Sequence, residues 1–246
     1  MSERTETIVV FGATSHLAQG CCRLLAEAGH ALVLVGRSPE RLDSVKNDLA
    51  ARGATVSVVQ ADLDDFDGHE SLVSTVSDAD SFWFFAGSLP DQKQCESTWD
   101  ATHAAMVTNG ISAISLLTRL ANVCEQRRAG SFVVISSVAG DRGRSSNYIY
   151  GAAKGAVSVF CEGLRGRMQR AGVGVLVIKP GFFISPMTAD IEKKPAVLWV
   201  EAEQVAKAVV SGWQAGKDVV YAPWFWRPIM RIIREVPTRI FKKLSI

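Results

Sequence analysis

The sequence of 246 residues predicts a single doubly wound α/β domain, with helices on both faces of a seven-stranded parallel sheet. Three observations carry this prediction. Short apolar segments alternate along the chain with longer segments of helical periodicity. The apolar segments lack the apolar–polar alternation of half-exposed strands, which indicates that helices cover both faces of the sheet. The length suits one α/β domain better than two.

The predicted strands are short apolar runs, and helical periodicity fills most of the segments between them. The strands are expected at 8–11, 31–35, 55–59, 81–85, 132–136, 173–178 and 219–222, and the helices at 17–28, 39–51, 99–127, 148–170 and 202–215. Pro39 suits a first helical turn, and Gly29 and Gly53 follow helix ends. Ligands of such sheets bind at the carboxyl ends of the strands, so the residues after each strand are the candidate site.

The composition is that of an ordinary globular enzyme, with 48% hydrophobic and 21% charged residues and a net charge of +2. The five cysteines form no CxxC pair and the four histidines have no metal-ligand spacing, so we expect a cytoplasmic protein without a metal site. The polar N-terminus predicts no signal peptide. No apolar run is expected to approach the ~18–20 residues that span a bilayer.

A phosphate site is predicted where the first strand meets its helix. Backbone N–H groups of a glycine-containing turn, together with the helix dipole, favour a pyrophosphate at such a place. The residues expected to contact a dinucleotide here are Gly12, Thr14, Ser15, His16 and Leu17. His16 and Ala18 replace two glycines of the usual pattern, so an ordinary strand-to-helix turn stays the alternative.

The ends of the next strands refine the expected ligand. An acid usually meets the ribose 2′-hydroxyl of NAD after the second strand, but this chain has Arg37 and Ser38 there. The planar guanidinium of Arg37 can pair with a 2′-phosphate, which favours NADP(H) over NAD. Ser38 can add a hydrogen bond or cap the helix that begins at Pro39. Asp62 and Leu63 follow the third strand and are expected at the adenine, unless Asp62 is a helix cap.

Small residues follow the fourth strand, and an acid/base group follows the fifth. Ala86 and Gly87 allow the backbone to approach a cofactor closely. Tyr150 and Lys154 share one helix face, where a nearby ammonium lowers the pKa of the tyrosine and prepares it for proton transfer. Ser137 ends the fifth strand and can orient the same substrate oxygen, and Lys154 can hold the nicotinamide ribose. A half-buried tyrosine beside a lysine is the unspecific alternative.

With these motifs in place, the sequence resembles the short-chain dehydrogenase/reductase family from Ile8 to about Tyr221. The resemblance implies a Rossmann-type domain in which Ser137, Tyr150 and Lys154 are catalytic and Asn109 holds a proton-relay water. It also implies that the segment with Pro180, Gly181, Phe183 and Ser185 meets the nicotinamide. Two departures from the family pattern are the lost glycines of the first turn and Phe85, which stands where the family has asparagine.

The resemblance extends to a subgroup of reductases related to decaprenylphosphoryl-2-keto-ribose reductase, which implies a keto-sugar or lipid-linked carbonyl substrate. A small soluble ketone or a 3-oxoacyl thioester is the alternative substrate, and a non-catalytic NADP-binding sensor or scaffold is the alternative function. The segment 186–200 is expected to cover the substrate, with Lys193, Lys194 and Trp199 near it.

Residues 1–222 are expected to form the NADP-binding domain and residues 223–246 its basic, aromatic, amphipathic tail. Pro237 should break the tail helix. The tail suits contact with anionic lipid, which would place the protein at the inner face of the membrane, and equally suits packing on the body or across a dimer interface. The family resemblance implies a homodimer or homotetramer. Nucleic-acid binding is not expected, because no base-reading module accompanies the basic segment.

Overall fold

The computed structural model describes residues 5–189 and 195–244 of the chain. Seven parallel strands form one sheet in the order β3-β2-β1-β4-β5-β6-β9. Their bounds are β1 Thr7–Phe11, β2 Ala31–Gly36, β3 Val56–Gln60, β4 Ser81–Phe84, β5 Ser131–Ile135, β6 Gly174–Pro180 and β9 Val219–Ala222. The strand order reverses between β1 and β4, which places the crevice of a doubly wound sheet at the carboxyl ends of these two strands.

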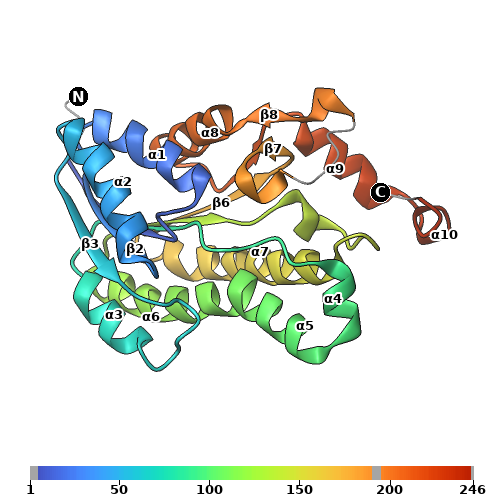
Figure 1. Ribbon diagram of the computed structural model, residues 1–246, viewed down its shortest axis with the longest axis horizontal. Coiled ribbons are helices and arrows are strands. Elements are labelled where there is room, and N and C mark those ends of the chain that lie inside the picture. Colours follow the sequence, from blue (N-terminus) through green and yellow to red (C-terminus); the bar gives the residue numbers. More distant parts are fainter. Residues whose placement is uncertain (1–4, 190–194, 245–246) are drawn as a thin grey trace.

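Helices cover both faces of this sheet (Figure 1). One face carries α1 His16–Glu27, α2 Pro39–Ala51 and α8 Ala202–Gln214, and the other carries α3 His69–Val76, α5 Trp99–Met106, α6 Ser112–Arg127 and α7 Tyr148–Gln169. Each face has its own apolar core, and fully buried aromatic side chains such as Phe11, Phe82 and Trp83 alternate between the two. The doubly wound parallel fold predicted from the sequence is confirmed.

Several short elements were not predicted. α3 and α4 Gln92–Ser97 are short helices, and β7 Phe183–Ile184 pairs with β8 Val200–Glu201 in a separate two-stranded sheet. The expected helix 99–127 is divided by a π-helical turn, Val107–Ile111, between α5 and α6. A π-helical turn is rare and frequently marks a functional site.

The stretch Trp99–Arg127 is long and apolar enough to cross a membrane by length and composition, so the expectation that no segment reaches this length was wrong. In the fold it is a core element. Leu116, Leu117 and Leu120 on α6 are completely buried against the sheet.

The C-terminal segment packs on the body and then leaves it. α9 Trp226–Glu235 and α10 Thr238–Phe241 are separated at Pro237, where the sequence predicted a break. Trp226 and Met230 are buried in a small cluster with Val138. Ile229 and Ile233 pack against this cluster, while Ile232 is 68% exposed, so the body covers only part of the apolar face of α9. Beyond α9 the chain projects from the body (Figure 1).

Candidate active site

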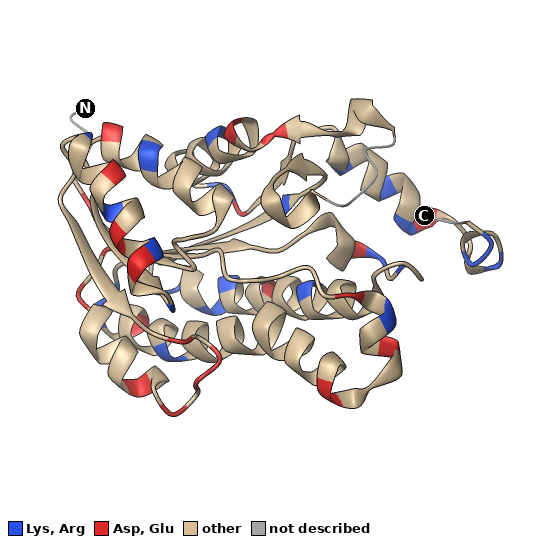
Figure 2. Cartoon of the chain, viewed as in Figure 1, with Lys and Arg blue, Asp and Glu red and all other residues tan. Residues whose placement is uncertain are grey.

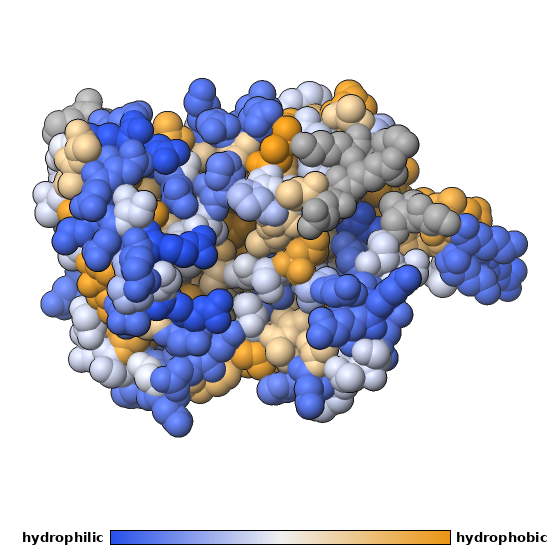
Figure 3. Space-filling model, viewed as in Figure 1, coloured by the Kyte–Doolittle hydropathy of each residue, from blue (hydrophilic) through white to orange (hydrophobic). Residues whose placement is uncertain are grey.

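A cavity of about 530 Å³ lies at the carboxyl ends of β1 to β5. Its opening is the hollow near the middle of the face in Figure 3. Most of the residues that the sequence predicted for cofactor or substrate line it: Gly12, Thr14, Ser15, His16, Leu17, Arg37, Asp62, Leu63, Ala86, Gly87, Asn109, Tyr150, Lys154, Phe183 and Ser185. Ser38, Ser137, Pro180 and Gly181 are not among the described residues that line it. This volume is that of a typical ligand site.

The first turn is tightly packed against the end of β4. Gly12 has a φ of +76°, and a Cβ built on it would lie 2.7 Å from the backbone nitrogen of Ala86. Ser15 caps α1, because its Oγ accepts a hydrogen bond of 3.3 Å from the N–H of Ala18. The glycine therefore lets the two loops at the topological switch point touch.

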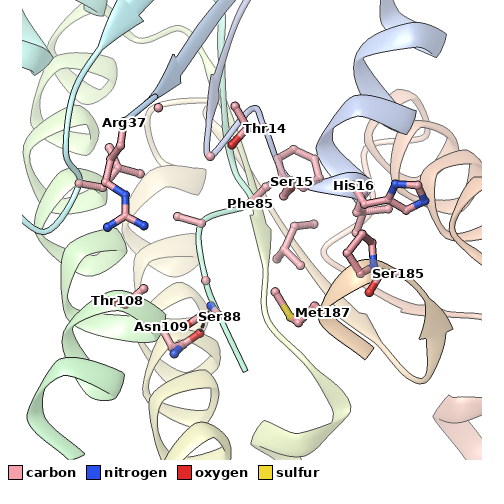
Figure 4. A pocket seen from close by; sticks show the side chains of 18 of the residues that line it. Thr14, Ser15, His16, Arg37, Phe85, Ser88, Thr108, Asn109, Ser185 and Met187 are labelled. Atoms are coloured by element: carbon pink, nitrogen blue, oxygen red, sulfur yellow. Dashed lines mark hydrogen bonds between the residues drawn. The ribbon is translucent and has the colours of Figure 1, made fainter. Parts of the chain in front are cut away.

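Two arginines stand at the end of the cavity near β2. Figure 4 shows Arg37 on one side of the cavity and Thr14, Ser15 and His16 on the other. The Arg37 side chain is 70% exposed and lies 3.9 Å from a carboxylate oxygen of Asp62. Arg41, which the sequence did not single out, donates a hydrogen bond of 3.1 Å to the carbonyl oxygen of Thr14. Both guanidinium groups can meet a phosphate here.

Ser38 takes the alternative role that the sequence left open for it. Its Oγ caps α2 by accepting a hydrogen bond of 3.3 Å from the N–H of Arg41 and donates one of 2.8 Å to Glu40. This hydroxyl is therefore committed to the first turn of α2.

Asn109 lies in the π-helical turn and is almost completely buried, at 1% exposure. Its Oδ1 accepts a hydrogen bond of 2.9 Å from the N–H of Ser88, and its Nδ2 donates one of 3.0 Å to Ala105 (Figure 4). A Cβ on Gly87 would lie 2.9 Å from Asn109 Oδ1 and 3.3 Å from Lys154 Nζ. The glycine after β4 therefore allows Asn109 and Lys154 to approach each other.

Asp64 supports the π-helical turn from the end of β3. Its two carboxylate oxygens accept hydrogen bonds of 2.6 Å from Thr108 and 2.7 Å from Ser112. No sequence pattern indicates this pair of contacts, because they join residues that only the fold brings together. Asp64 thus acts as a positioning residue for the backbone that carries Asn109.

Glycines bring the loop after β5 onto α7. A Cβ on Gly140 would lie 2.7 Å from the backbone nitrogen of Gly155, and one on Gly151 would lie 2.8 Å from the carbonyl oxygen of Ala139. The sequence predicted that the small residues around Tyr150 admit a cofactor or a partner helix. In the fold, the 3-10 turn Val138–Asp141 occupies much of this space. This packing fixes Ser137 beside Tyr150.

Tyr150 and Lys154 line the cavity, and the Ser137 side chain adjoins Tyr150 from outside its lining. Burial raises the pKa of Tyr150, and its hydrogen bond with the Ser137 side chain opposes that shift. Lys154 is 5% exposed, donates a hydrogen bond of 3.2 Å to the Ile135 carbonyl oxygen and lies 5.9 Å from the Tyr150 ring. Burial lowers the pKa of Lys154 to about 8.

The pKa of Tyr150 therefore shifts in the direction opposite to the one the sequence predicted. Desolvation of the phenolate dominates, while the Lys154 ammonium stands at 5.9 Å from the ring centre. A phenol with a raised pKa holds its proton at neutral pH, so this group is suited to give a proton to a ligand oxygen that enters the cavity.

The comparisons with known proteins show the family to which the chain belongs. Residues 6–196 match the short chain dehydrogenase family. An uncharacterised oxidoreductase of Mycobacterium tuberculosis (strain ATCC 25618 / H37Rv) is 36% identical over 96% of each chain. An uncharacterised oxidoreductase of Streptomyces coelicolor is 31% identical over 98% of this chain and 96% of its own.

Two solved structures show the same fold. A short chain dehydrogenase from Burkholderia cenocepacia J2315 in complex with NADP has a TM-score of 0.84 and 20% identity over 100% of both chains. A short-chain dehydrogenase from Sphingobium yanoikuyae in complex with NADPH has a TM-score of 0.81 and 22% identity over 95% of this chain and 97% of that chain. The chain therefore belongs to the short-chain dehydrogenase/reductase family and is an NAD(P)-dependent oxidoreductase.

Proposed function

We propose that this protein is an NADP(H)-dependent reductase of a carbonyl group, with Tyr150 as the acid/base group. One observation carries the proposal: a single cavity joins the paired arginines at the end of β2 to Tyr150 and Lys154 on α7. The arginines suit the phosphate-rich end of a dinucleotide, and the tyrosine suits a reacting oxygen. A non-catalytic NADP-binding protein would need Lys154 to hold the cofactor but would need no acid/base group at Tyr150.

The residues that line the cavity fit NADP(H). Gly12 to Leu17 would hold the pyrophosphate, Arg37 and Arg41 the 2′-phosphate, and Asp62 and Leu63 the adenine. Phe183, Ser185 and Lys154 would hold the nicotinamide riboside, and Pro180 and Gly181 belong to the segment that leads into Phe183. Solved relatives in complex with NADP and NADPH support this choice. When bound, the reduced nicotinamide supplies the hydride.

The protein residues manage the proton. Tyr150 Oη donates its proton to the carbonyl oxygen of the substrate, and Ser137 orients that oxygen by a hydrogen bond. The proton on Tyr150 is then restored from the side of Lys154 and Asn109, which adjoin each other across Gly87. In the reverse direction Tyr150 must first lose its proton, which its raised pKa disfavours.

Turnover tests the proposal directly. The purified protein with NADPH is offered keto-sugars, 3-oxoacyl thioesters and small neutral ketones, and the loss of reduced nicotinamide is followed by absorbance. We expect at least one class to be reduced. Tight binding of NADPH with no turnover of any carbonyl would favour the sensor or scaffold function instead.

The C-terminal tail, here called the C-terminal arm (α9, α10 and Trp224 before them), supports a lipid-linked substrate. Figure 2 shows basic residues along α9 and α10, among them Arg231, Arg234 and Arg239. Trp224 is 78% exposed and Ile240 is 55% exposed on the same segment. Basic side chains next to exposed apolar ones suit an anionic lipid surface at the inner face of the membrane.

Sedimentation with lipid vesicles tests the arm. We expect the protein to bind vesicles that contain phosphatidylglycerol and to be released by salt, because basic side chains contribute about 1 kcal/mol each at such a surface. Arg231→Glu with Arg239→Glu should abolish binding. Equal sedimentation with neutral phosphatidylcholine vesicles would contradict the electrostatic contact.

The proposal includes assembly as a homodimer or homotetramer. Val159 on α7 is 70% exposed and Trp99 at the start of α5 is 72% exposed. Apolar side chains of this size on neighbouring helices support burial against a second copy.

A further inference from the structure

Arg144 lies in the segment that joins Ser137 to Tyr150, and its side chain is buried without a counter-charge from the described residues. The residue is 9% exposed, and its Nε has no hydrogen-bond partner. Within residues 5–189 and 195–244, no carboxylate pairs with the guanidinium, and burial alone lowers the pKa of Arg144. Arginine keeps its charge in proteins, so among the described residues this guanidinium is a largely buried cation without a counter-charge.

Asn147 adds an unsatisfied acceptor at the start of α7. Its Oδ1 is buried and has no hydrogen-bond partner among the described residues. Asn147 precedes Tyr148, where α7 begins with neither a side-chain cap nor an acidic residue in its first turn. The positive end of the helix dipole therefore adds to the charge of Arg144 on the segment that leads directly into Tyr150.

Other contacts hold this segment in place. The carboxylate of Asp141, 2% exposed, pairs with Lys179 and accepts a hydrogen bond of 2.7 Å from the Tyr221 hydroxyl. Arg142 donates hydrogen bonds to the carbonyl oxygens of Ile233 and Arg234 at the end of α9. Arg144 thus belongs to a fixed part of the fold. Native proteins satisfy nearly all buried polar groups, so the unpaired Nε of Arg144 and Oδ1 of Asn147 need a partner that is not among the described residues.

We infer that Arg144 and Asn147 form a subsite for an anionic group, phosphate or carboxylate, of the carbonyl substrate. Arg144 pairs with the anion, and Asn147 Oδ1 accepts a hydrogen bond from a hydroxyl of the same molecule. Arg144 and Asn147 lie outside the lining of the cavity, on the segment that leads into Tyr150, so the anionic group extends from the reacting carbonyl toward the start of α7. This inference rests on the proposed function and specifies its substrate class as an anionic hydroxy-ketone.

Binding to the NADPH-loaded protein tests the subsite while the cofactor's own phosphates fill their sites. Phenyl phosphate, benzoate and benzyl alcohol are titrated separately by calorimetry. We expect an anion to bind and the neutral alcohol not to bind, and the tighter of the two anions identifies phosphate or carboxylate. Arg144→Gln should weaken anion binding about tenfold or more, and Arg144→Lys should restore part of it, because the lost contact is a charge-assisted hydrogen bond.

Arg170→Gln is the matched control, since Arg170 is exposed at the C-terminal end of α7, whereas Arg144 precedes its N-terminal end. It should bind the anion as the wild type does. Binding of neither anion by the wild type, or equal binding by wild type and Arg144→Gln, would overturn the subsite.

Thermal unfolding separates a ligand-binding role from a structural one. Arg144→Met keeps the volume and removes the uncompensated charge, so its Tm should equal or exceed that of the wild type. A lower Tm would show that Arg144 stabilises the fold and would contradict the inference. These measurements need no turnover, so they test the subsite separately from the proposed function. If the protein binds the anion but reduces no carbonyl, the subsite is supported and the proposed function is contradicted.

Discussion

Replacing Tyr150 with phenylalanine is expected to lower kcat for carbonyl reduction by about 10²–10⁴-fold, because the positioned proton donor is lost. The ring stays, so the packing of α7 against the turn Val138–Asp141 and the affinity for NADPH should change little. Steady-state kinetics with the best substrate of the carbonyl panel measure kcat, and nicotinamide fluorescence measures cofactor binding on the same preparation.

The pH dependence of kcat/KM for the wild type is a second test of the acid/base group. Lys154 has a pKa of about 8, so its ammonium is present below that pH and is lost above it. We expect kcat/KM for reduction to fall as the pH rises through this value, since the charge beside Tyr150 disappears. Activity of Tyr150→Phe equal to that of the wild type at every pH would remove Tyr150 from the mechanism.

Replacing Gly12 with alanine is expected to destabilise the fold and abolish NADPH binding. The positive φ alone costs about 1–2 kcal/mol for a residue with a Cβ. The Cβ would also lie 2.7 Å from the backbone nitrogen of Ala86, which neither loop can avoid without moving. Overpacking of this kind adds about 1–3 kcal/mol, and urea unfolding measures the sum.

Gly29 provides a matched control for Gly12. Its φ is +85°, but a Cβ there would have no atom within 4 Å. Gly29→Ala should therefore lose only the backbone term of about 1–2 kcal/mol and should keep full NADPH affinity. Equal losses of stability in the two variants would show that the contact between the β1 and β4 loops does not matter.

The sequence predicted the sheet well because the strands of a buried parallel sheet are short apolar runs. The sequence did not predict α3, which contains the completely buried His69. The His69 ring nitrogens are hydrogen-bonded to Ser115 and to the Leu63 carbonyl oxygen. Histidine counts as a polar residue when apolar positions are searched for helical spacing, so the buried face of α3 does not stand out in the sequence.

In the candidate site, the sequence predicts contacts within one helix but not contacts between separate elements. Lys154 could be predicted because an i, i+4 spacing fixes its relation to Tyr150 within one helix. Arg41 and Asp64 could not, because their contacts with Thr14 and Thr108 join separate elements. The direction of the Tyr150 pKa shift was also wrong, since desolvation depends on the packing around the phenol, which residue spacing does not reveal.

Cofactor preference tests the central claim most directly. The protein is titrated with NADPH and NADH by nicotinamide fluorescence, with Arg37→Asp and Arg37→Lys alongside. We predict that NADPH binds the wild type more tightly and that Arg37→Asp removes about 10–100-fold of this preference, the worth of a charge-assisted contact with the 2′-phosphate. Arg37→Lys should keep part of it. Equal binding of NADPH and NADH by the wild type would contradict the NADP(H) assignment, and binding of neither would contradict the cofactor site itself.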